Sequence, residues 1–209
     1  MMSVTRGILT PVLFVAGFLL TGCDRVNRVS EALELTGTVS GITPQPIGPD
    51  RLRVLLPGTG AVAALAPVAQ NSDVTVWQTL DGITLSFRRG VLVATRGLGD
   101  DLMSADVEGN INLLRRTGGD GYYSHIRSYL DGENQTVFRS YQCRRTGQAP
   151  TSVKVSDQVT SARRIEVLCV SQGDEFANIF WLDGTGRVIK SRQWVSTAVQ
   201  YMETERIPR

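Results

Sequence analysis

Histidine and cysteine are scarce in this sequence, which has one histidine and three cysteines among 209 residues. His125 is therefore the one base available to a serine or cysteine nucleophile, and no nucleophile-elbow motif accompanies it, which argues against a catalytic triad. Cys143 and Cys169 stand far apart and, with one histidine, do not form the ligand spacing of a zinc site. We therefore expect no metal ion and no cofactor.

A marked excess of charge of either sign is also missing. The chain has 22 lysines and arginines against 20 aspartates and glutamates, which gives a formal net charge of +2. Nucleic-acid-binding proteins usually carry a basic patch or stripe, so we expect no nucleic-acid partner. The basic residues are scattered, and short pairs of them are typical of solvated faces. Four such pairs occur: Arg88-Arg89, Arg115-Arg116, Arg144-Arg145 and Arg163-Arg164.

The sequence has no apolar run of the roughly 20 residues that a transmembrane helix needs. The uncharged run from Gly7 to Leu20 is shorter and follows a single basic residue, Arg6, which is the layout of a secretory signal. It ends in Leu20-Thr21-Gly22-Cys23, which resembles a bacterial lipobox. In such signals the peptide is cut before the cysteine, which is acylated. We therefore predict a lipoprotein signal peptide over residues 1–22 and a covalent lipid on Cys23. The alternative is an ordinary secretory peptide that contains a cysteine.

Removing residues 1–22 from 209 leaves 187 residues, enough to bury a core. We expect an acylated tether over residues 23–36 and a single mainly-β periplasmic domain over residues 37–209. The segment from Thr36 to Asp50, where the tether meets this domain, is rich in glycine, proline and threonine and is typical of a loop.

Residues after Asp50 alternate with a period of two and are rich in β-branched and aromatic types, which predicts strands. Arg51–Leu56 and Thr197–Ile207 fit this pattern, whereas Ala61–Ala69 contains Pro67 and indicates an irregular or edge strand. The tripeptide Leu-Asp-Gly occurs three times, and Asp-Gly favours a hairpin because glycine takes positive φ at low cost. The expected hairpins are Val74–Thr79 with Ile83–Arg88, Tyr122–Tyr129 with Gln135–Arg144, and Phe176–Trp181 with Arg187–Trp194.

Helical spacing is clear only from Leu102 to Arg116, with a weaker indication between Val26 and Leu35. The buried positions expected on the first of these helices are Leu102, Val107, Ile111 and Leu114. Strands outnumber helices heavily and do not alternate with them. The predicted fold is mainly β, with antiparallel sheets forming a barrel-like or sandwich domain and one or two short helices.

The run from Gly90 to Val107 contains the densest set of candidate ligands. Asp100, Asp101 and Asp106 suit a calcium ion, or the Gly97 and Gly99 amides suit an anion. A structural interpretation is favoured, since a dinucleotide loop would need a third glycine and a phosphate loop would need a lysine. In that interpretation the glycines form a tight turn, Asp100 or Asp101 caps the following helix, and Arg96 pairs with a carboxylate.

Two further alternatives concern sugars. A carboxylate pair such as Asp106 with Glu166 would suit glycoside hydrolysis. Three tryptophans, Trp77, Trp181 and Trp194, would suit stacking on sugar rings, although tryptophans flanked by alternating strand residues are mostly packed in a core.

Export would place Cys143 and Cys169 in a compartment where disulfides persist. Each lies in a strand-like run, so one bridge between neighbouring strands fits the sequence. The alternative is two buried free thiols.

Two short runs carry a family resemblance: Thr95-Arg96-Gly97-Leu98-Gly99 and Ser191-Arg192-Gln193-Trp194. Together with Phe176–Trp181, they resemble signatures of the YjbF/GfcB family of lipoproteins, encoded in bacterial exopolysaccharide and group 4 capsule operons. The resemblance implies a mostly β, periplasm-facing lipoprotein without known catalytic activity that assists polysaccharide secretion. It also implies as partners an outer-membrane β-barrel protein and a periplasmic protein of the same operon, with polysaccharide as a candidate ligand. The two cysteines fall where the family tends to place cysteines, which favours the bridge.

Asp24 bears on the location of the lipid anchor. The task proposed for the family places the protein at the periplasmic face of the outer membrane. In enteric bacteria an aspartate directly after the acylated cysteine commonly retains a lipoprotein in the inner membrane, which is the alternative. A polysaccharide-modifying hydrolase and a glycan-binding module stay open as other functions.

Overall fold

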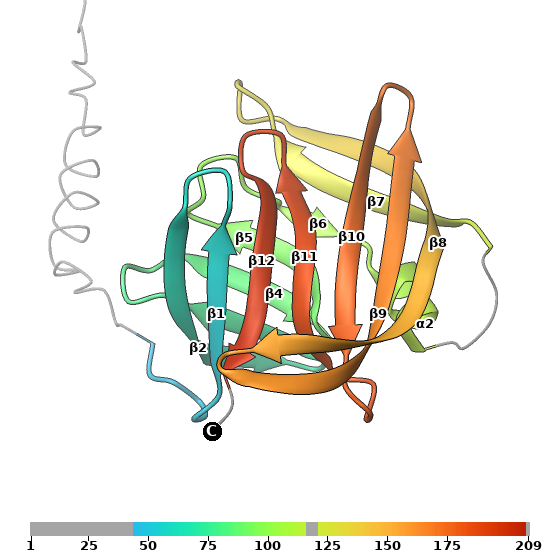
Figure 1. The fold of residues 1–209 in the computed structure, drawn as a ribbon. Helices are drawn as coiled ribbons and strands as arrows, with labels where there is room; N and C mark the ends of the chain where they lie inside the picture. The colour runs from blue at the N-terminus through green and yellow to red at the C-terminus, as the bar shows by residue number, and fades with distance from the viewer. Residues whose placement is uncertain (1–43, 116–120, 208–209) are drawn as a thin grey trace, which may run out of the picture. The chain divides into compact units, whose positions relative to one another are not determined.

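Strands dominate the part of the chain that the structure, a computed structural model, describes: residues 44–115 and 121–207 (Figure 1). The predicted signal peptide, the lipidated Cys23 and the tether lie outside the described residues. Within the described ranges there are twelve strands and one helix. They are β1 (Arg51–Leu56), β2 (Ala61–Asn71), β3 (Val74–Gln78), β4 (Thr84–Arg88), β5 (Val91–Arg96), β6 (Ser104–Ala105), α2 (Glu108–Arg115), β7 (Tyr123–Leu130), β8 (Thr136–Val155), β9 (Gln158–Ser171), β10 (Asp174–Leu182), β11 (Val188–Ser196) and β12 (Gln200–Ile207).

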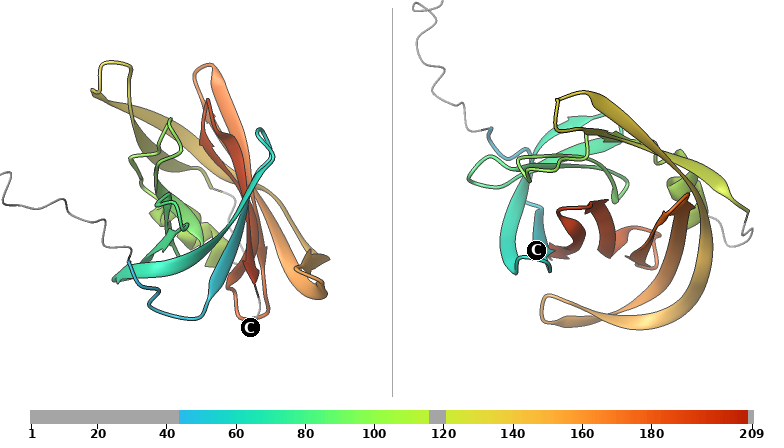
Figure 2. Two further views of the ribbon diagram at one scale, coloured as in Figure 1. Left: turned by 90° about the vertical axis from the view of Figure 1, so that its left-hand side faces the viewer. Right: turned by 90° about the horizontal axis from the view of Figure 1, so that it is seen from above.

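The twelve strands form one sheet in the order β5-β4-β3-β2-β1-β12-β11-β10-β9-β8-β7-β6. Every neighbouring pair is antiparallel. Strands that pair are neighbours along the chain, with one exception: β1 pairs with β12. The consecutive strands β5 and β6 are the two ends of the sheet and do not pair. Seen from above, the sheet curves into an almost complete ring (Figure 2). The prediction of a mainly β, antiparallel, barrel-like fold is confirmed.

Alternation along the strands places one set of side chains inside the barrel, as the period of two requires. On β10, Phe176, Asn178, Phe180 and Leu182 are buried, whereas the residues between them are at least partly exposed. The interior contains two apolar clusters, and α2 packs its apolar side chains into the first of them. The first cluster is centred on Phe180 and the second includes Trp77.

The strand predicted to be irregular is β2, and it turns a corner of the barrel. Its first half pairs with β1 up to Leu65, and its second half pairs with β3 from Ala66 onward. A bulge follows at Pro67, which cannot donate a ladder hydrogen bond. The predicted irregularity is confirmed, but the edge position is wrong because β2 lies between two partners.

The helix is shorter than the pattern predicted. It begins at Glu108 instead of Leu102. The preceding residues pair with the edge of the barrel, because the Met103 and Asp106 amides donate to the Ser128 and Ile126 carbonyls. The predicted burial of Leu102, Val107, Ile111 and Leu114 is confirmed. Leu102 and Val107 face the core from the segment before the helix, and Ile111 and Leu114 face it from the helix itself. The spacing of apolar residues alone cannot distinguish these two backbone conformations.

All three Leu-Asp-Gly hairpins form, but the reason expected for them holds at only one. Gly82 has a φ of 92°. In the second and third hairpins, the Asp131 and Asp183 carboxylates instead accept backbone amide hydrogen bonds from within the turn. Positive φ falls later in these two turns, on Asn134 and Gly186.

The β8–β9 hairpin is longer than the others, with strands of 20 and 14 residues. Its far end crosses in front of the lower ends of the neighbouring strands, as the orange ribbon in Figure 1 shows, and the Ser156 amide at its tip donates to Glu205 of β12. Among the described residues, no helix has the length and apolar character needed to cross a membrane.

Candidate functional site

The first signature run, Thr95–Gly99, is a turn organised by one carboxylate. Asp101 accepts hydrogen bonds from the Thr95 hydroxyl at 2.7 Å and from the Gly97 and Leu98 amides at 2.8 and 3.1 Å. The Thr95 hydroxyl oxygen also accepts from the Leu102 amide at 3.0 Å. Gly97 has a φ of 94°, which a side chain would disfavour. The tight turn that the glycines of this run predicted is therefore confirmed.

Two details of that interpretation were wrong. Asp101 caps the turn and not the helix, whose first amide, that of Glu108, donates to the Asp106 carboxylate at 3.1 Å. Within the described ranges Arg96 pairs with no carboxylate; its guanidinium donates to the carbonyls of Thr95, Leu102 and Met103. Arg96 thus ties strand β5 to the segment before β6, at the place where the two ends of the sheet approach each other.

The second signature run, Ser191–Trp194, contains the side chain that holds β5 against the opposite wall. Gln193 of β11 accepts a hydrogen bond from the Leu92 amide at 2.9 Å and donates to the Gly90 carbonyl at 3.0 Å. It therefore pairs with backbone groups on an outermost strand that have no neighbouring strand. Gln193 also donates to the Ser191 hydroxyl, which is hydrogen-bonded to Thr204 at 2.6 Å. All of these polar side chains are buried.

Trp194 of the same run belongs to an aromatic cluster. Its ring stacks on Phe176 at 5.9 Å between centroids and meets Tyr201 edge-on at 5.1 Å. The Tyr201 ring in turn carries the Arg192 guanidinium at 3.5 Å from its centroid. Residues on both faces of strand β11 therefore have a packing role in this run. Ser191 and Gln193 are hydrogen-bonded inside the barrel, and Arg192 packs against an aromatic ring.

Next to this cluster lies a charged side chain that is only 2 % exposed, Arg127. It donates to the carbonyls of Trp194 and Val195 at 2.9 Å each. Its guanidinium also lies 5.4 Å from the Phe176 ring centroid. Burial lowers the pKa of Arg127. Arg127 links β7 to β11 across the interior.

His125, on the same strand, has no nucleophile as a partner. Its Nδ1 lies 2.7 Å from the Asp106 carbonyl oxygen, which can only accept, so Nδ1 carries the proton. Burial, together with the positive charge of Arg127, lowers the pKa of His125 to about 4. The ring is neutral at physiological pH and has a structural position.

Cys143 and Cys169 form a disulfide. They lie directly opposite each other on the antiparallel strands β8 and β9, and both are fully buried. The predicted pairing is confirmed, and the alternative of two free thiols is not.

The candidate acidic residues do not assemble into one site. Asp100 accepts from the Ala198 amide at 3.3 Å, and Asp106 caps α2. Glu166 forms an ion pair with Arg164 at 2.8 Å on β9. In the described part of the chain, no group of three or more histidine, cysteine or acidic residues is arranged to hold a metal ion.

The tryptophans are likewise dispersed. Trp194 is packed in the aromatic cluster, and Trp181 lies between the buried Phe180 and Leu182 on β10, facing the other side of the sheet. Trp77 is 4 % exposed and lines a hollow of about 120 Å³. Trp77 thus borders a cavity.

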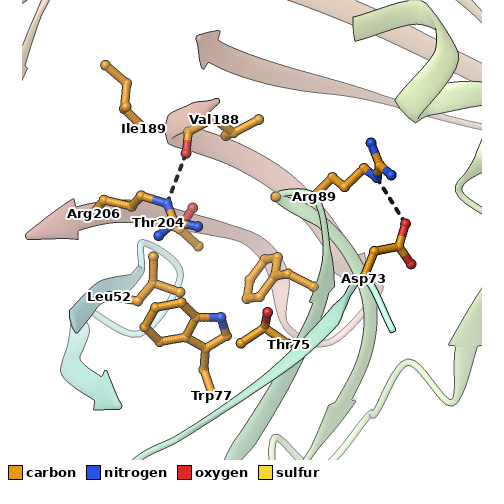
Figure 3. Close-up of a pocket in the computed structure, with 11 residues that line it drawn as sticks. Leu52, Asp73, Thr75, Trp77, Arg89, Val188, Ile189, Thr204 and Arg206 are labelled. Carbon is orange, nitrogen blue, oxygen red and sulfur yellow. Dashed lines mark hydrogen bonds and ion pairs between the residues drawn. The ribbon is translucent and has the colours of Figure 1, made fainter. Parts of the chain in front are cut away.

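This hollow is lined by residues of strands β1, β3, β4, β11 and β12 and of the β2–β3 and β4–β5 turns (Figure 3). Trp77 and Leu52 form an apolar side, and Arg89 and Arg206 lie on either side of the hollow. Arg206 donates to the Val188 carbonyl at 3.3 Å, and Arg89 forms an ion pair with Asp73 at 2.9 Å.

A larger hollow of about 440 Å³ adjoins it and shares Arg89, Gly90, Val188 and Arg206 in its lining. The walls come from the β4–β5 and β10–β11 turns, strands β9 and β12, and the end of α2. We call it the arginine basin, after the five arginines that line it: Arg89, Arg115, Arg163, Arg187 and Arg206.

The arginine basin is the feature that sequence reasoning missed. Arg89, Arg115 and Arg163 belong to three of the arginine pairs that the sequence favoured as solvated faces. They are separated by 26 and 48 residues along the chain (115 − 89 and 163 − 115). Nothing in the local pattern could indicate that they share one hollow, because barrel closure brings them together.

Comparisons with known proteins agree with this fold. Residues 49–207 match the model of the family described as group 4 capsule polysaccharide lipoprotein gfcB, YjbF. The crystal structure of the hypothetical lipoprotein YmcC from Escherichia coli K12 is similar, with a TM-score of 0.63 and 17% sequence identity. That alignment covers 87% of this chain and 94% of the other, and at this identity it bears on the fold alone. A search of curated proteins found no match.

Proposed function

Because this chain belongs to the YjbF family of group 4 capsule polysaccharide lipoproteins, we propose that it assists secretion of a capsular or extracellular polysaccharide without catalysing a reaction. The observation that carries the proposal is the family match over residues 49–207, which includes all twelve described strands. In this proposal a lipid on Cys23 holds the protein at the periplasmic face of the outer membrane. Its partners are an outer-membrane β-barrel protein and a periplasmic protein encoded in the same operon.

The contacts of the candidate acids support a non-enzymatic role. Asp101 organises a turn, Asp106 caps a helix, and Glu166 is engaged in an ion pair. A glycosidase needs two carboxylates facing one bond, one of them able to donate a proton. Release of reducing sugar from the purified polysaccharide by the purified protein, lost on Asp106→Asn, would contradict the proposal.

Deletion of the gene, under conditions in which its operon is expressed, tests the proposal directly. We expect less surface or secreted polysaccharide, restored by the wild-type gene but not by Cys23→Ser, which cannot be acylated. An immunoblot must show that both versions are present in equal amounts. Unchanged polysaccharide in the deletion strain refutes the proposal.

Membrane fractionation tests the location separately. The wild-type protein is expected in the outer-membrane fraction, and Asp24→Ser serves as the matched variant. If Asp24 acts as a retention signal in this bacterium, the wild type will be found in the inner membrane and Asp24→Ser will move to the outer membrane. That result would overturn the location but not the role in secretion.

A further inference from the structure

The arginine basin has a charge distribution unlike the rest of the chain. The sequence as a whole is nearly neutral, at +2. In contrast, the residues that line the basin include five arginines and no aspartate or glutamate. Guanidinium groups gathered around a hollow of about 440 Å³ provide many N–H donors and a positive potential, and no acceptor side chain of opposite charge faces them within the lining.

The carboxylates next to the basin are shared between arginines. Asp73 is hydrogen-bonded by both Arg88 and Arg89, which lowers its pKa. Asp50 serves both Arg187 and Arg206, at 3.6 and 3.9 Å. These last two distances exceed the 2.7–2.9 Å of a tight charge-assisted hydrogen bond. Asp183 is also within electrostatic reach of both arginines, yet their ion pairs with Asp50 are long, which leaves donors of Arg187 and Arg206 available to a ligand.

Like charges also lie close together at the basin, where Arg206 is partly buried and Arg187 is exposed. Burial and the neighbouring Arg187 lower the pKa of Arg206, so the folded protein keeps this cation in an unfavourable place. The backbone around it is closely packed. A Cβ added to Gly90 would lie 2.6 Å from the Val188 Cβ, and Gly90 is held by Gln193 of the second signature. The wall of the basin at Gly90 and Val188 is therefore closely packed without a ligand, and a preformed wall favours binding.

The size and lining of the basin indicate the class of ligand. A hollow of about 440 Å³ is within the range of small-molecule sites and accommodates one or two sugar residues. Guanidinium forks match the geometry of a carboxylate. Thr185 lines the basin, and Thr75, Thr204 and Trp77 line the smaller hollow beside it. Hydroxyl groups and an aromatic ring next to cationic forks suit a sugar that carries an acid.

We infer that the arginine basin binds an acidic saccharide, with the carboxylate of a hexuronate residue held by Arg187, Arg206 and Arg115. The choice of a sugar rests on the proposed function, which brings a polysaccharide to this protein. The choice of an anion rests on the arginines alone.

Titration calorimetry of the full acylated protein in detergent tests this inference. The probe is a tetrasaccharide of galacturonic acid, and the comparison ligand is its carboxyl-reduced, neutral counterpart. We expect binding of the acidic probe only, with affinity that falls as salt is raised. Arg187→Gln combined with Arg115→Gln should weaken it at least about tenfold, since charge-assisted hydrogen bonds are lost. Both side chains are exposed or nearly so, and unchanged thermal melting will show that the double variant folds.

Arg53→Gln is the control for each of the two substitutions, because it removes one positive charge from an exposed position. Arg53 neighbours Leu52 on β1 and therefore points to the opposite face from the hollow that Leu52 lines. Equal loss of binding in this control, equal binding of the neutral tetrasaccharide, or unaltered binding by the double variant would overturn the inference. So would tighter binding of inorganic phosphate than of the acidic probe, which would assign the basin to a phosphorylated ligand.

The proposed function and this inference can fail separately. If deletion of the gene lowers polysaccharide while the double variant binds the tetrasaccharide as the wild type does, the basin assignment falls and the secretion role stands. If deletion has no effect, the secretion role falls whatever the titration shows.

Discussion

Protonation of His125 should destabilise the fold, and the size of the effect can be worked out. The ring is 3 % exposed and donates from Nδ1 to the Asp106 carbonyl. Arg127 lies on the same strand, and the Phe176 ring stands 6.3 Å away. Burial and the charge of Arg127 lower the pKa of His125 from 6.5 to about 4.

The sign follows from which state binds the proton. Between pH 6.5 and 4 the unfolded chain takes up a proton on His125 and the folded protein does not, so the free energy of unfolding falls as pH falls. The pKa of His125 differs by roughly 2.5 between the unfolded and folded states, and each pKa unit corresponds to about 1.36 kcal/mol. The free energy of unfolding should therefore fall by about 3 kcal/mol between pH 7 and pH 4. This loss is large beside the typical total stability of 5–15 kcal/mol.

Urea denaturation at several pH values measures the effect, with His125→Asn as the comparison. Asparagine offers an N–H near the Nδ1 position and does not titrate, so it preserves the hydrogen bond to the Asp106 carbonyl. Titration of the carboxylates changes the free energy of unfolding equally in the wild type and in the variant. The wild type should therefore lose about 3 kcal/mol more than the variant on going from pH 7 to pH 4. Parallel pH profiles for the two proteins would refute the assignment of a neutral, buried His125.

Three further changes should alter stability, each measured by urea denaturation at pH 7. Replacing Cys143 and Cys169 together by alanine opens a bridge between residues 26 apart and should cost about 3 kcal/mol in the chain-entropy model; a loss below about 1 kcal/mol would contradict it. Gln193→Leu leaves the buried Leu92 amide without an acceptor and should cost about 1–3 kcal/mol, whereas an unchanged midpoint would show that β5 does not depend on it. Asp101→Ala removes three hydrogen bonds from the first signature turn and should cost at least about 1–3 kcal/mol; stability equal to that of Asp100→Ala, whose carboxylate accepts one exposed bond, would argue against the turn as described.

Local patterns predicted the elements well where side-chain alternation was regular. The strand pattern over Phe176–Trp181 and the Leu-Asp-Gly turn after it produced the β10–β11 hairpin as expected. The predicted start of the helix at Leu102 was wrong because the spacing of apolar residues indicates only which residues are buried. Leu102 is buried, but it lies in a non-helical segment before the helix. The predicted carboxylate partner of Arg96 was wrong because the turn after β5 brings the backbone carbonyls of Leu102 and Met103 within reach of its guanidinium.

The sequence alone determined the period of two, the positions of the turns and the two cysteines, because these depend on residues that are close along the chain or chemically distinctive. Its predictions of a signal peptide and of a lipid on Cys23 rest on the same kind of local signal. The tertiary structure decided what the signatures do, since Gln193 meets Leu92 across 101 residues. It also decided where the charge gathers. Arginines from separate pairs line one basin only because an antiparallel sheet that curves on itself brings their turns and strand ends together.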